Sequence, residues 1–209
     1  MQGIINILLS YLIGSISGSI VLGKLRGIDI RTMGSGNAGG TNAFRTVGAF
    51  FALGVIIVDI FKGVISVLFI SQFNLSINAN IELITIGCAI AAVLGHVYPI
   101  YYKFKGGKGA GTLIGIIAVL FPFQCILYAI GAWIVMLISS GYVGLSTMIA
   151  GVTLSISAFF LNVPFNYFCF SITMSLFIIF THRSNIQRML KGEENQFKKI
   201  MIFNKLFKK

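Results

Sequence analysis

Long apolar runs separated by short polar connections dominate the pattern of this chain. Six runs are long enough for a membrane-spanning helix: residues 3–22, 47–71, 82–101, 123–139, 143–161 and 165–182. A helix needs about 20 apolar residues to cross the hydrocarbon core of a bilayer. A shorter run, Gly109 to Phe121, ends at Pro122, which favours a turn into the next helix. The pattern predicts an all-α, polytopic membrane helix bundle with about seven transmembrane helices.

The connections between these runs differ in charge. Lys and Arg gather in residues 23–46, in residues 102–112 and after Phe180, whereas residues 72–81 and 162–166 carry none. The positive-inside rule then places the basic connections and the C-terminus in the cytoplasm and the N-terminus outside. This orientation requires an odd number of spans. Seven segments satisfy it if Gly109–Phe121 and 123–139 form a hairpin that returns to the cytoplasmic side.

Composition supports a membrane protein. Of the 209 residues 56% are hydrophobic and 10% charged, and the mean hydropathy is +0.93, whereas soluble domains carry about 25% charged residues. The net charge of +11 lies almost wholly in the connections and the tail, which suits anionic lipids and anionic substrates and gives no reason to expect nucleic acid.

The apolar run at the start has no basic flank before it and no cleavage motif after it, so we expect it to be retained as a span. Without an internal repeat or a low-complexity linker, residues 1–197 are predicted to form one transmembrane domain. The lysine-rich residues 198–209 form a basic tail, which is either a membrane-surface helix or disordered.

The cysteines Cys88, Cys125 and Cys169 each lie inside an apolar run without paired spacing. We expect small buried hydrophobic residues, with no disulfide, no metal site and no thiol nucleophile. No other motif calls for a metal or a cofactor.

The first polar stretch with candidate chemistry is residues 33–45. Glycine allows close approach of backbone N–H groups to an anion, and an arginine offers a planar fork for phosphate. The candidate donors and glycines are Gly34, Ser35, Gly36, Asn37, Thr41, Asn42 and Arg45. Residues 34–39 match G-x-G-x-x-G, but no strand precedes them, so a dinucleotide fold is not indicated. The alternative is a flexible interfacial loop with glycines that pack against helices.

The second stretch, residues 95–109, leaves one apolar run at Pro99 and enters the next at Gly109. Its glycines therefore lie at a helix N-terminus, where free N–H groups and the helix dipole favour an anion. The candidate binding residues are His96, Lys105, Gly106, Gly107, Lys108 and Gly109. The alternative is a positive-inside loop that only orients the protein.

Two further pairs stand out. His182 and Asn185 close the last apolar run and share a face if they lie on one helix, with either a structural or a catalytic role. Asp59 and Lys62 lie three residues apart inside the second run, where charges usually pair or line a polar interior. An internal ion pair and a substrate contact both fit them.

Together these motifs closely resemble the bacterial acyl-phosphate:glycerol-3-phosphate acyltransferase family of the PlsY type. The likeness covers Gly34–Arg45, Gly95–Gly109 and His182–Glu193 most clearly, and the length and span layout along nearly the whole chain. It implies acyl transfer from acyl phosphate to the 1-hydroxyl of glycerol 3-phosphate, giving lysophosphatidic acid and phosphate. It also implies a multi-pass protein of the bacterial inner membrane, in contact with membrane lipid, with its active site facing the cytoplasm; we expect a monomer.

The resemblance also implies roles for single residues. Ser35, Arg45, Lys105 and Asn185 match phosphate-clamping residues, Gly106–Gly109 matches the acyl-phosphate-binding loop, and His182 matches a site histidine. A serine of the family is replaced here by Gly144, so Ser146 or Thr147 would have to supply a hydroxyl at that place.

Two other function classes share parts of this pattern. A transporter of phosphorylated metabolites would place ionisable residues near the midplane and show inverted repeats, whereas only Asp59 and Lys62 are deep and no repeat is visible. A purely structural membrane subunit would not need anion-binding loops.

Overall fold

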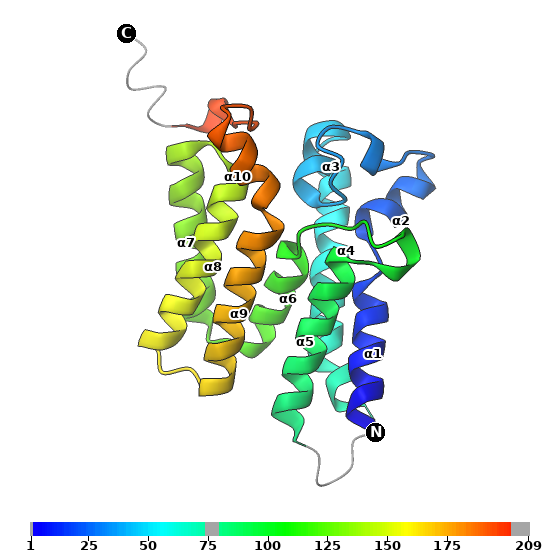
Figure 1. The fold of residues 1–209 in the computed structure, drawn as a ribbon, viewed down its shortest axis with the longest axis vertical. Helices are drawn as coiled ribbons and strands as arrows, with labels where there is room; N and C mark the ends of the chain where they lie inside the picture. Colours follow the sequence, from blue (N-terminus) through cyan, green and yellow to red (C-terminus); the bar gives the residue numbers. More distant parts are fainter. Residues whose placement is uncertain (1, 74–79, 202–209) are drawn as a thin grey trace. The chain divides into compact units, whose positions relative to one another are not determined.

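The computed structural model describes residues 2–73 and 80–201. These residues form α-helices, short 3-10 turns and loops, with no strand among them (Figure 1), so the all-α prediction is confirmed. The helices fall into two compact units, Met1–Leu120 and Phe121–Lys209. The first unit contains α1 (Gln2–Gly14), α2 (Gly18–Leu25), α3 (Gly40–Thr46), α4 (Ala49–Leu68), α5 (Ile81–Val97) and α6 (Ala110–Leu120). The second contains α7 (Phe123–Ser140), α8 (Val143–Phe160), α9 (Phe165–Thr181) and α10 (Arg183–Leu190).

Apart from the first run, the helices agree with the apolar runs in place and length. In the described residues four helices are long and apolar enough to cross a membrane, or six if each of two bent pairs forms one span. At 11 residues, α6 reaches only about 16 Å at 1.5 Å per residue, which is too short to span alone. The count of seven spans, their orientation, and the division into residues 1–197 and a tail stay predictions. Residues 74–79 of one uncharged connection and 202–209 of the tail lie outside the described residues.

Glycines bring the helices of the first unit into backbone contact. In Figure 1 α1 lies beside α5, where a side chain on Gly14 would collide with the Ala92 carbonyl and one on Gly95 with the Tyr11 carbonyl. In the same way α4 meets α6, where Gly115 lies against the Ile60 carbonyl. Helices in membranes associate through such small residues because van der Waals packing replaces the hydrophobic effect there.

Replacing Gly115 by alanine should therefore destabilise the first unit. The added Cβ would meet the Ile60 carbonyl, a backbone atom that moves only if α4 and α6 separate, and such overpacking costs about 1–3 kcal/mol. The measurement is thermal unfolding in detergent. Gly131→Ala in α7 is the matched control, since nothing lies within 4 Å of a Cβ there, and we expect it to unfold at or above the wild-type temperature. Equal behaviour of the two variants would contradict close α4–α6 packing.

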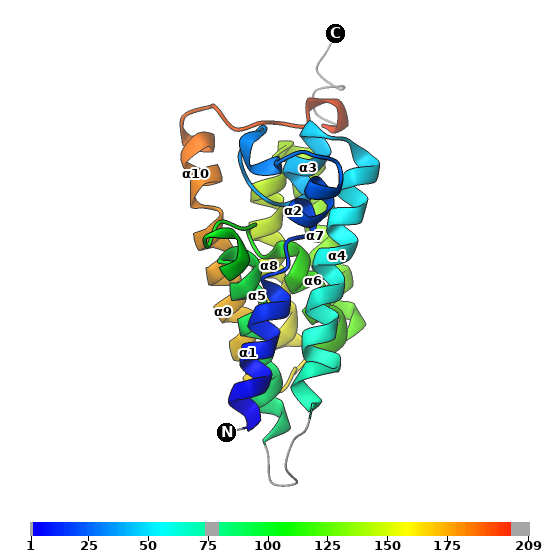
Figure 2. The same cartoon turned by 90° about the vertical axis from the view of Figure 1, so that its right-hand side faces the viewer.

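The first predicted span, residues 3–22, is not one straight helix. It breaks at Ser15–Ser17, where α1 and α2 meet at an angle of 45° (Figure 2). Side chains from outside the segment bind the backbone groups at the break: Lys62 Nζ donates to the Ile16 carbonyl at 2.8 Å, and the Gly18 N–H faces Asp59 Oδ1 at 3.4 Å. The apolar run hides this break because its cause lies in another helix.

In the second unit α7 packs on α8, and α8 on α9. Gly141, with φ of 71°, ends α7 in the left-handed region and turns the chain into α8. The Gly141 carbonyl accepts a hydrogen bond from the Phe197 N–H at 2.9 Å. The segment after α10 thus returns to the α7–α8 turn, and the first residues of the predicted tail follow it as a 3-10 turn, Lys198–Ile200.

The cysteine prediction is correct for two of the three positions. Cys88 and Cys125 are buried, whereas Cys169 is exposed on α9. An apolar run does not reveal which face of its helix packs inward, and for a membrane span lipid accommodates a thiol as readily as a protein core does.

Candidate active site

The first glycine-rich loop, Gly34–Gly39, folds around the side chain of Asn42. This side chain is 2% exposed, and its Oδ1 accepts from the Ser35 N–H at 3.0 Å. Its Nδ2 donates to three carbonyls in and just before the loop, those of Ile30 (3.2 Å), Met33 (2.9 Å) and Asn37 (3.0 Å). Both hydrogen-bonding atoms of the amide are therefore engaged by backbone, and Asn42 fixes the loop from inside.

Backbone conformation explains the glycines of this loop. Gly34 and Gly36 have φ of 56° and 70°, in the left-handed region that glycine adopts without a steric penalty. A Cβ at Gly34 would also collide with Asn42 Oδ1. These constraints leave Ser35 and Gly36 exposed at the surface of the loop.

Helix α3 follows the loop and carries the remaining predicted donors. Thr41 lies in its first turn and Arg45 in its last, and both side chains are partly exposed. Arg31, just before the loop, is already paired: its guanidinium donates to Asp29, with Nη2 2.7 Å from Oδ2. These hydrogen bonds from Arg31 lower the pKa of Asp29 to about 2. The two charges therefore cancel above roughly pH 3.

The second loop, Tyr98–Gly109, is held against the end of α5. The Gly107 N–H donates to the His96 carbonyl at 3.1 Å and the Gly106 N–H to the Val97 carbonyl at 3.2 Å. Lys103 and Phe104 both have positive φ, 55° and 59°, a conformation that side chains rarely adopt and that often marks functional loops. The result is a tight fold that leaves Lys105 exposed at its tip.

The same loop ends at the N-terminus of a helix, as the sequence predicts. Gly109, with φ of 92°, precedes α6, which begins at Ala110. Gly107 and Gly109 are buried, while Gly106 and Lys108 are partly exposed. The first N–H groups of α6 have no partner within the helix, so an anion is favoured at this point.

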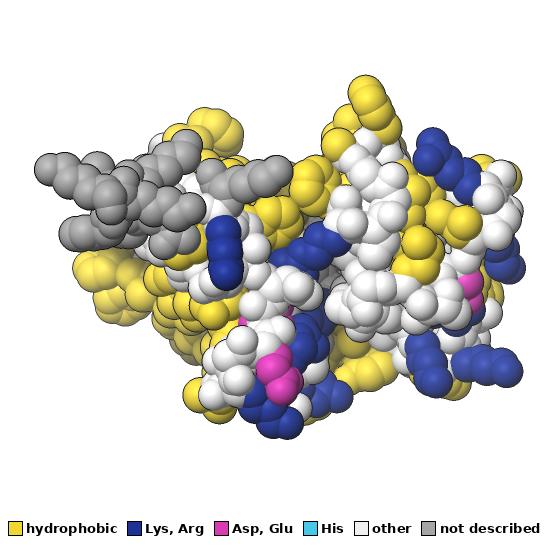
Figure 3. All heavy atoms as spheres, turned by 90° about the horizontal axis from the view of Figure 1, so that it is seen from above, with side chains coloured by type: hydrophobic (Ala, Val, Ile, Leu, Met, Phe, Trp, Pro, Cys, Tyr) yellow, Lys and Arg dark blue, Asp and Glu magenta, His cyan; other side chains and the backbone are white. Residues whose placement is uncertain are grey.

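Both loops are anchored to one hydrophobic core at the same end of the first unit (Figure 2). Tyr102, from the second loop, packs against a buried cluster that includes Ile30, Ala38 and Ala43 around the first loop. Lys24 Nζ lies 5.8 Å from the centroid of the Tyr102 ring, a cation–π contact. Lys and Arg side chains are spread over the face seen in Figure 3. The first unit thus presents two glycine-rich loops together in a positively charged setting.

Behind the second loop lies a buried ionic cluster of Asp59, Lys62 and His96. Asp59 Oδ1 lies 3.0 Å from Lys62 Nζ and 3.5 Å from His96 Nδ1, and all three side chains are 4% exposed. The ion-pair interpretation of Asp59 and Lys62 is therefore correct. His96 points its ring at Asp59, so its predicted contact with substrate stays untested.

In the second unit, His182 and Asn185 lie at a bend. Helices α9 and α10 meet there at 51°, so the two residues flank a helix junction, whereas the sequence suggested one helix face. His182 Nδ1 lies 2.8 Å from the Ile178 carbonyl. Nδ1 therefore donates in the neutral ring and leaves Nε2 as the basic nitrogen. Both side chains are buried, with exposed fractions of 5% and 7%.

Glu194 is the partner that sequence reasoning missed. Its Oε1 accepts from Asn185 Nδ2 at 2.9 Å, and its Oε2 accepts from Arg188 Nε at 2.6 Å. The carboxylate thereby orients the amide of Asn185. The sequence holds one weak signal: Glu193 and Glu194 are the only acidic residues after Glu82, and they are the acidic residues nearest in sequence to Arg183 and Arg188.

The hydroxyl groups of Ser146 and Thr147, which were expected to replace the serine missing at Gly144, both turn back onto the backbone of their own helix. Ser146 Oγ donates to the Tyr142 carbonyl and Thr147 Oγ1 to the Val143 carbonyl, both at 2.9 Å. A Cβ at Gly144 would lie 2.9 Å from the side chain of Asn185. The glycine therefore gives Asn185 room against α8.

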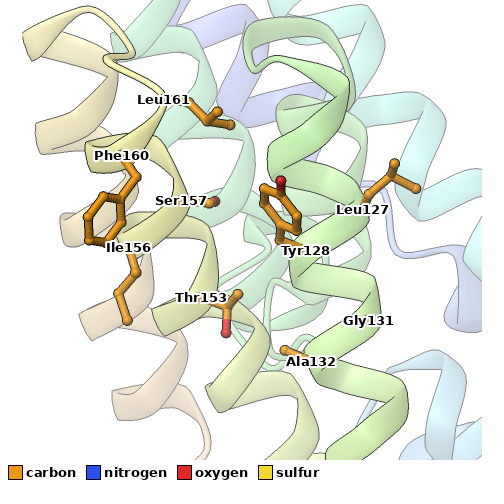
Figure 4. A pocket seen from close by; sticks show the side chains of 9 residues that line it. All are labelled: Leu127, Tyr128, Gly131, Ala132, Thr153, Ile156, Ser157, Phe160 and Leu161. Atoms are coloured by element: carbon orange, nitrogen blue, oxygen red, sulfur yellow. The ribbon is translucent and has the colours of Figure 1, made fainter.

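An open groove in the second unit contains none of the predicted site residues. Its volume is about 540 Å³, and it lies between α7 and α8, lined by apolar side chains such as Leu127, Ile156 and Phe160 (Figure 4). In the described part of the chain, no group of three or more His, Cys, Asp or Glu could hold a metal ion. The predicted site residues lie instead at the two loops, at the end of α5 and at the α9–α10 bend.

Comparison with known proteins agrees with this picture. Residues 4–192 match the family described as glycerol-3-phosphate acyltransferase. A glycerol-3-phosphate acyltransferase of Thermosipho melanesiensis is 37% identical, covering 94% of this chain and 93% of the relative. One of Fusobacterium nucleatum is 38% identical, covering 92% and 96%.

Solved structures give the same result. The crystal structure of PlsY, an integral membrane glycerol 3-phosphate acyltransferase in its glycerol 3-phosphate form, superposes with a TM-score of 0.84 at 32% identity and full coverage of both chains. Its lysophosphatidic acid form gives 0.82 at 33% identity, covering 94% of this chain and 96% of that one.

Proposed function

Because this chain belongs to the glycerol-3-phosphate acyltransferase family, we propose that it transfers a fatty acyl group from acyl phosphate to the 1-hydroxyl of glycerol 3-phosphate. The products are lysophosphatidic acid and inorganic phosphate. The chain is an integral membrane acyltransferase of phospholipid biosynthesis, and the identity of the acyl donor is the new element of the proposal.

One observation supports this donor above others. Two glycine-rich loops, each with a cationic side chain, share one hydrophobic core at one end of the first unit. Glycerol 3-phosphate needs one phosphate site, and a donor whose activating group is also a phosphate needs a second one. The first loop with Arg45 and the second with Lys105 provide the two.

The reaction then needs little beyond positioning and charge neutralisation. The oxygen of the 1-hydroxyl attacks the acyl carbonyl carbon and forms the ester bond. The bond from that carbon to the phosphate oxygen breaks, and its electron pair leaves with phosphate. Orientation of two bound reactants can lower a barrier by about 7–11 kcal/mol. Ser35, Arg45, Lys105 and Asn185 are assigned to hold the phosphate groups and stabilise the charge that develops on them.

The glycines and remaining polar groups support these four residues. Residues in and just after the first loop (Gly34, Gly36, Asn37, Thr41, Asn42) and residues of the second loop (Gly106, Gly107, Lys108, Gly109) are assigned to surround the phosphate groups. The hydroxyl proton passes either to His182 Nε2, which the Nδ1 contact with Ile178 leaves basic, or to a substrate phosphate. No cofactor takes part in either route.

We place the protein in the bacterial inner membrane as a monomer with seven spans. The cationic loops would face the cytoplasm under the positive-inside rule, where water-soluble glycerol 3-phosphate is found. The four long helices and the bent pairs α1–α2 and α9–α10 give six spans, and this topology needs α6, which is shorter than the hydrocarbon core is thick, as the seventh.

A donor comparison and a trapping experiment test the mechanism. Palmitoyl phosphate should give lysophosphatidic acid with the purified protein, whereas palmitoyl coenzyme A should give none. Incubation with radiolabelled palmitoyl phosphate and no acceptor should leave the protein unlabelled, because the hydroxyl attacks directly. A labelled serine or cysteine would contradict direct attack, and turnover of the thioester alone would overturn the choice of donor.

A further inference from the structure

Three buried ionisable side chains lie behind the second loop without a place in the chemistry described above. Asp59, Lys62 and His96 are each 4% exposed, so little of their surface is open to a substrate that binds at the surface of the loops. Each of the three nevertheless contacts a segment close to the candidate site, either the break between α1 and α2 or the second loop.

Asp59 and Lys62 connect α4 to the break in the first span. Lys62 Nζ donates to the Ile16 carbonyl at 2.8 Å and lies 3.0 Å from Asp59 Oδ1. Asp59 Oδ1 also faces the Gly18 N–H at the start of α2, at 3.4 Å. The ion pair therefore contacts two of the backbone groups that the break leaves without a helical partner.

His96 connects the same pair to the second loop. Its Nδ1 lies 3.5 Å from Asp59 Oδ1, and its carbonyl accepts from the Gly107 N–H at 3.1 Å. The opposite edge of the ring lies directly under the loop, because a Cβ on Gly107 would collide with Nε2. Gly111 of α6 packs closely against Asp59, since a Cβ added at Gly111 would lie 3.0 Å from the Cβ of Asp59.

We infer that Asp59, Lys62 and His96 are positioning residues, which hold residues Lys105–Gly109 of the second loop in their binding conformation. Asp59 of the ion pair faces one edge of the His96 ring, and the ring and carbonyl of His96 lie against Gly107 and Gly106. This inference rests on the proposed function, since it assigns the loop to one of the two phosphorylated substrates.

Burying charged side chains costs free energy, so the presence of this ion pair argues for a role besides stability. A buried ion pair replaced by apolar groups of similar volume is often neutral or more stable, and charges within spans are usually functional. An apolar pair could pack α4 equally well, but it could not bind the Ile16 carbonyl or orient the His96 ring.

The double variant Asp59→Leu/Lys62→Met separates positioning from folding. It removes both charges together, so it leaves no uncompensated buried ion, and we expect the protein to fold with only a moderate fall in unfolding temperature, from the lost contacts to the Ile16 carbonyl and the Gly18 N–H. The KM for the substrate bound by the loop should rise at least tenfold, while the KM for the other substrate changes less than about twofold. Loss of folded protein would lower the apparent kcat and leave both KM values unchanged.

Alanine at Gly107 and at Gly106 gives a second test that does not need the ion-pair variant. Gly107→Ala should raise the same KM, because its Cβ displaces the His96 ring. Adding His96→Ala frees that space, so the double variant should perform no worse than His96→Ala alone. Gly106→Ala is the matched control: its Cβ meets the His96 carbonyl and Pro99, which His96→Ala leaves in place, so its defect should persist.

The outcomes distinguish this inference from the proposed function. Absence of acyl transfer by the wild-type protein would overturn the proposed function. An active wild-type enzyme with unchanged KM values in the Asp59→Leu/Lys62→Met variant would overturn only the positioning role. The positioning role would also be overturned if Gly106→Ala and Gly107→Ala raised the KM equally and additively in the His96→Ala background.

Discussion

Replacing Arg45 by alanine should lower kcat/KM for acyl transfer by about 100- to 1,000-fold, the usual effect of losing one donor to a developing negative charge. Arg45 lies on α3, the helix that directly follows the first glycine-rich loop, and its side chain is partly exposed. A guanidinium binds a phosphate through two parallel hydrogen bonds. Arg45→Lys should therefore recover only part of the loss, because an ammonium supplies charge without the fork.

Arg31 offers the matched control for this prediction. It precedes the same loop, and its guanidinium is paired with Asp29 at 2.7 Å. Arg31→Ala should change kcat/KM by less than about fivefold, since the paired charges already offset each other. Steady-state kinetics on the four proteins decides the matter. Similar losses of kcat/KM in Arg31→Ala and Arg45→Ala would contradict a specific contact between Arg45 and phosphate. They would show that activity depends only on the overall positive charge.

Replacing Asn42 by leucine should abolish activity by a different route, through collapse of the first loop. The side chain makes four hydrogen bonds with loop backbone. At about 1 kcal/mol each, their loss amounts to about 2–4 kcal/mol once water has satisfied the more exposed groups. Loop opening should be local, because the helices around it keep their own contacts.

Limited proteolysis with trypsin measures this loop directly, since cleavage sites at Arg31 and Arg45 flank it. Cleavage there should be much faster in Asn42→Leu than in the wild type. Asn80→Ala is the control: Asn80 caps α5 with one bond, from the Leu83 N–H at 3.1 Å, and its loss should cost about 1 kcal/mol with normal cleavage at the loop. Wild-type cleavage and activity in Asn42→Leu would refute the structural role of Asn42.

The spans were predictable from the sequence because each depends on a local property, the length of an apolar run. The break at Ser15–Ser17 was not, since the groups that stabilise it belong to Asp59 and Lys62 on α4. A run of small and apolar residues looks the same whether it continues as a helix or breaks against a distant ion pair.

The candidate site shows the same limit in its side chains. Glycine spacing and charge located both loops, and the helix that begins after Gly109 was expected. The role of Asn42 inside its loop was missed, because an asparagine that binds backbone and one that binds a ligand look identical in sequence. Glu194 was missed for a related reason: its partners Asn185 and Arg188 are identified only by the fold of the chain after α10.

The most direct test of acyl transfer is phosphate release by the purified wild-type protein, with palmitoyl phosphate and glycerol 3-phosphate supplied singly and together. Direct transfer between two bound phosphorylated substrates predicts release only when both are present, with one lysophosphatidic acid formed for each phosphate. Release from palmitoyl phosphate alone, or folded protein that forms no lysophosphatidic acid, would contradict it.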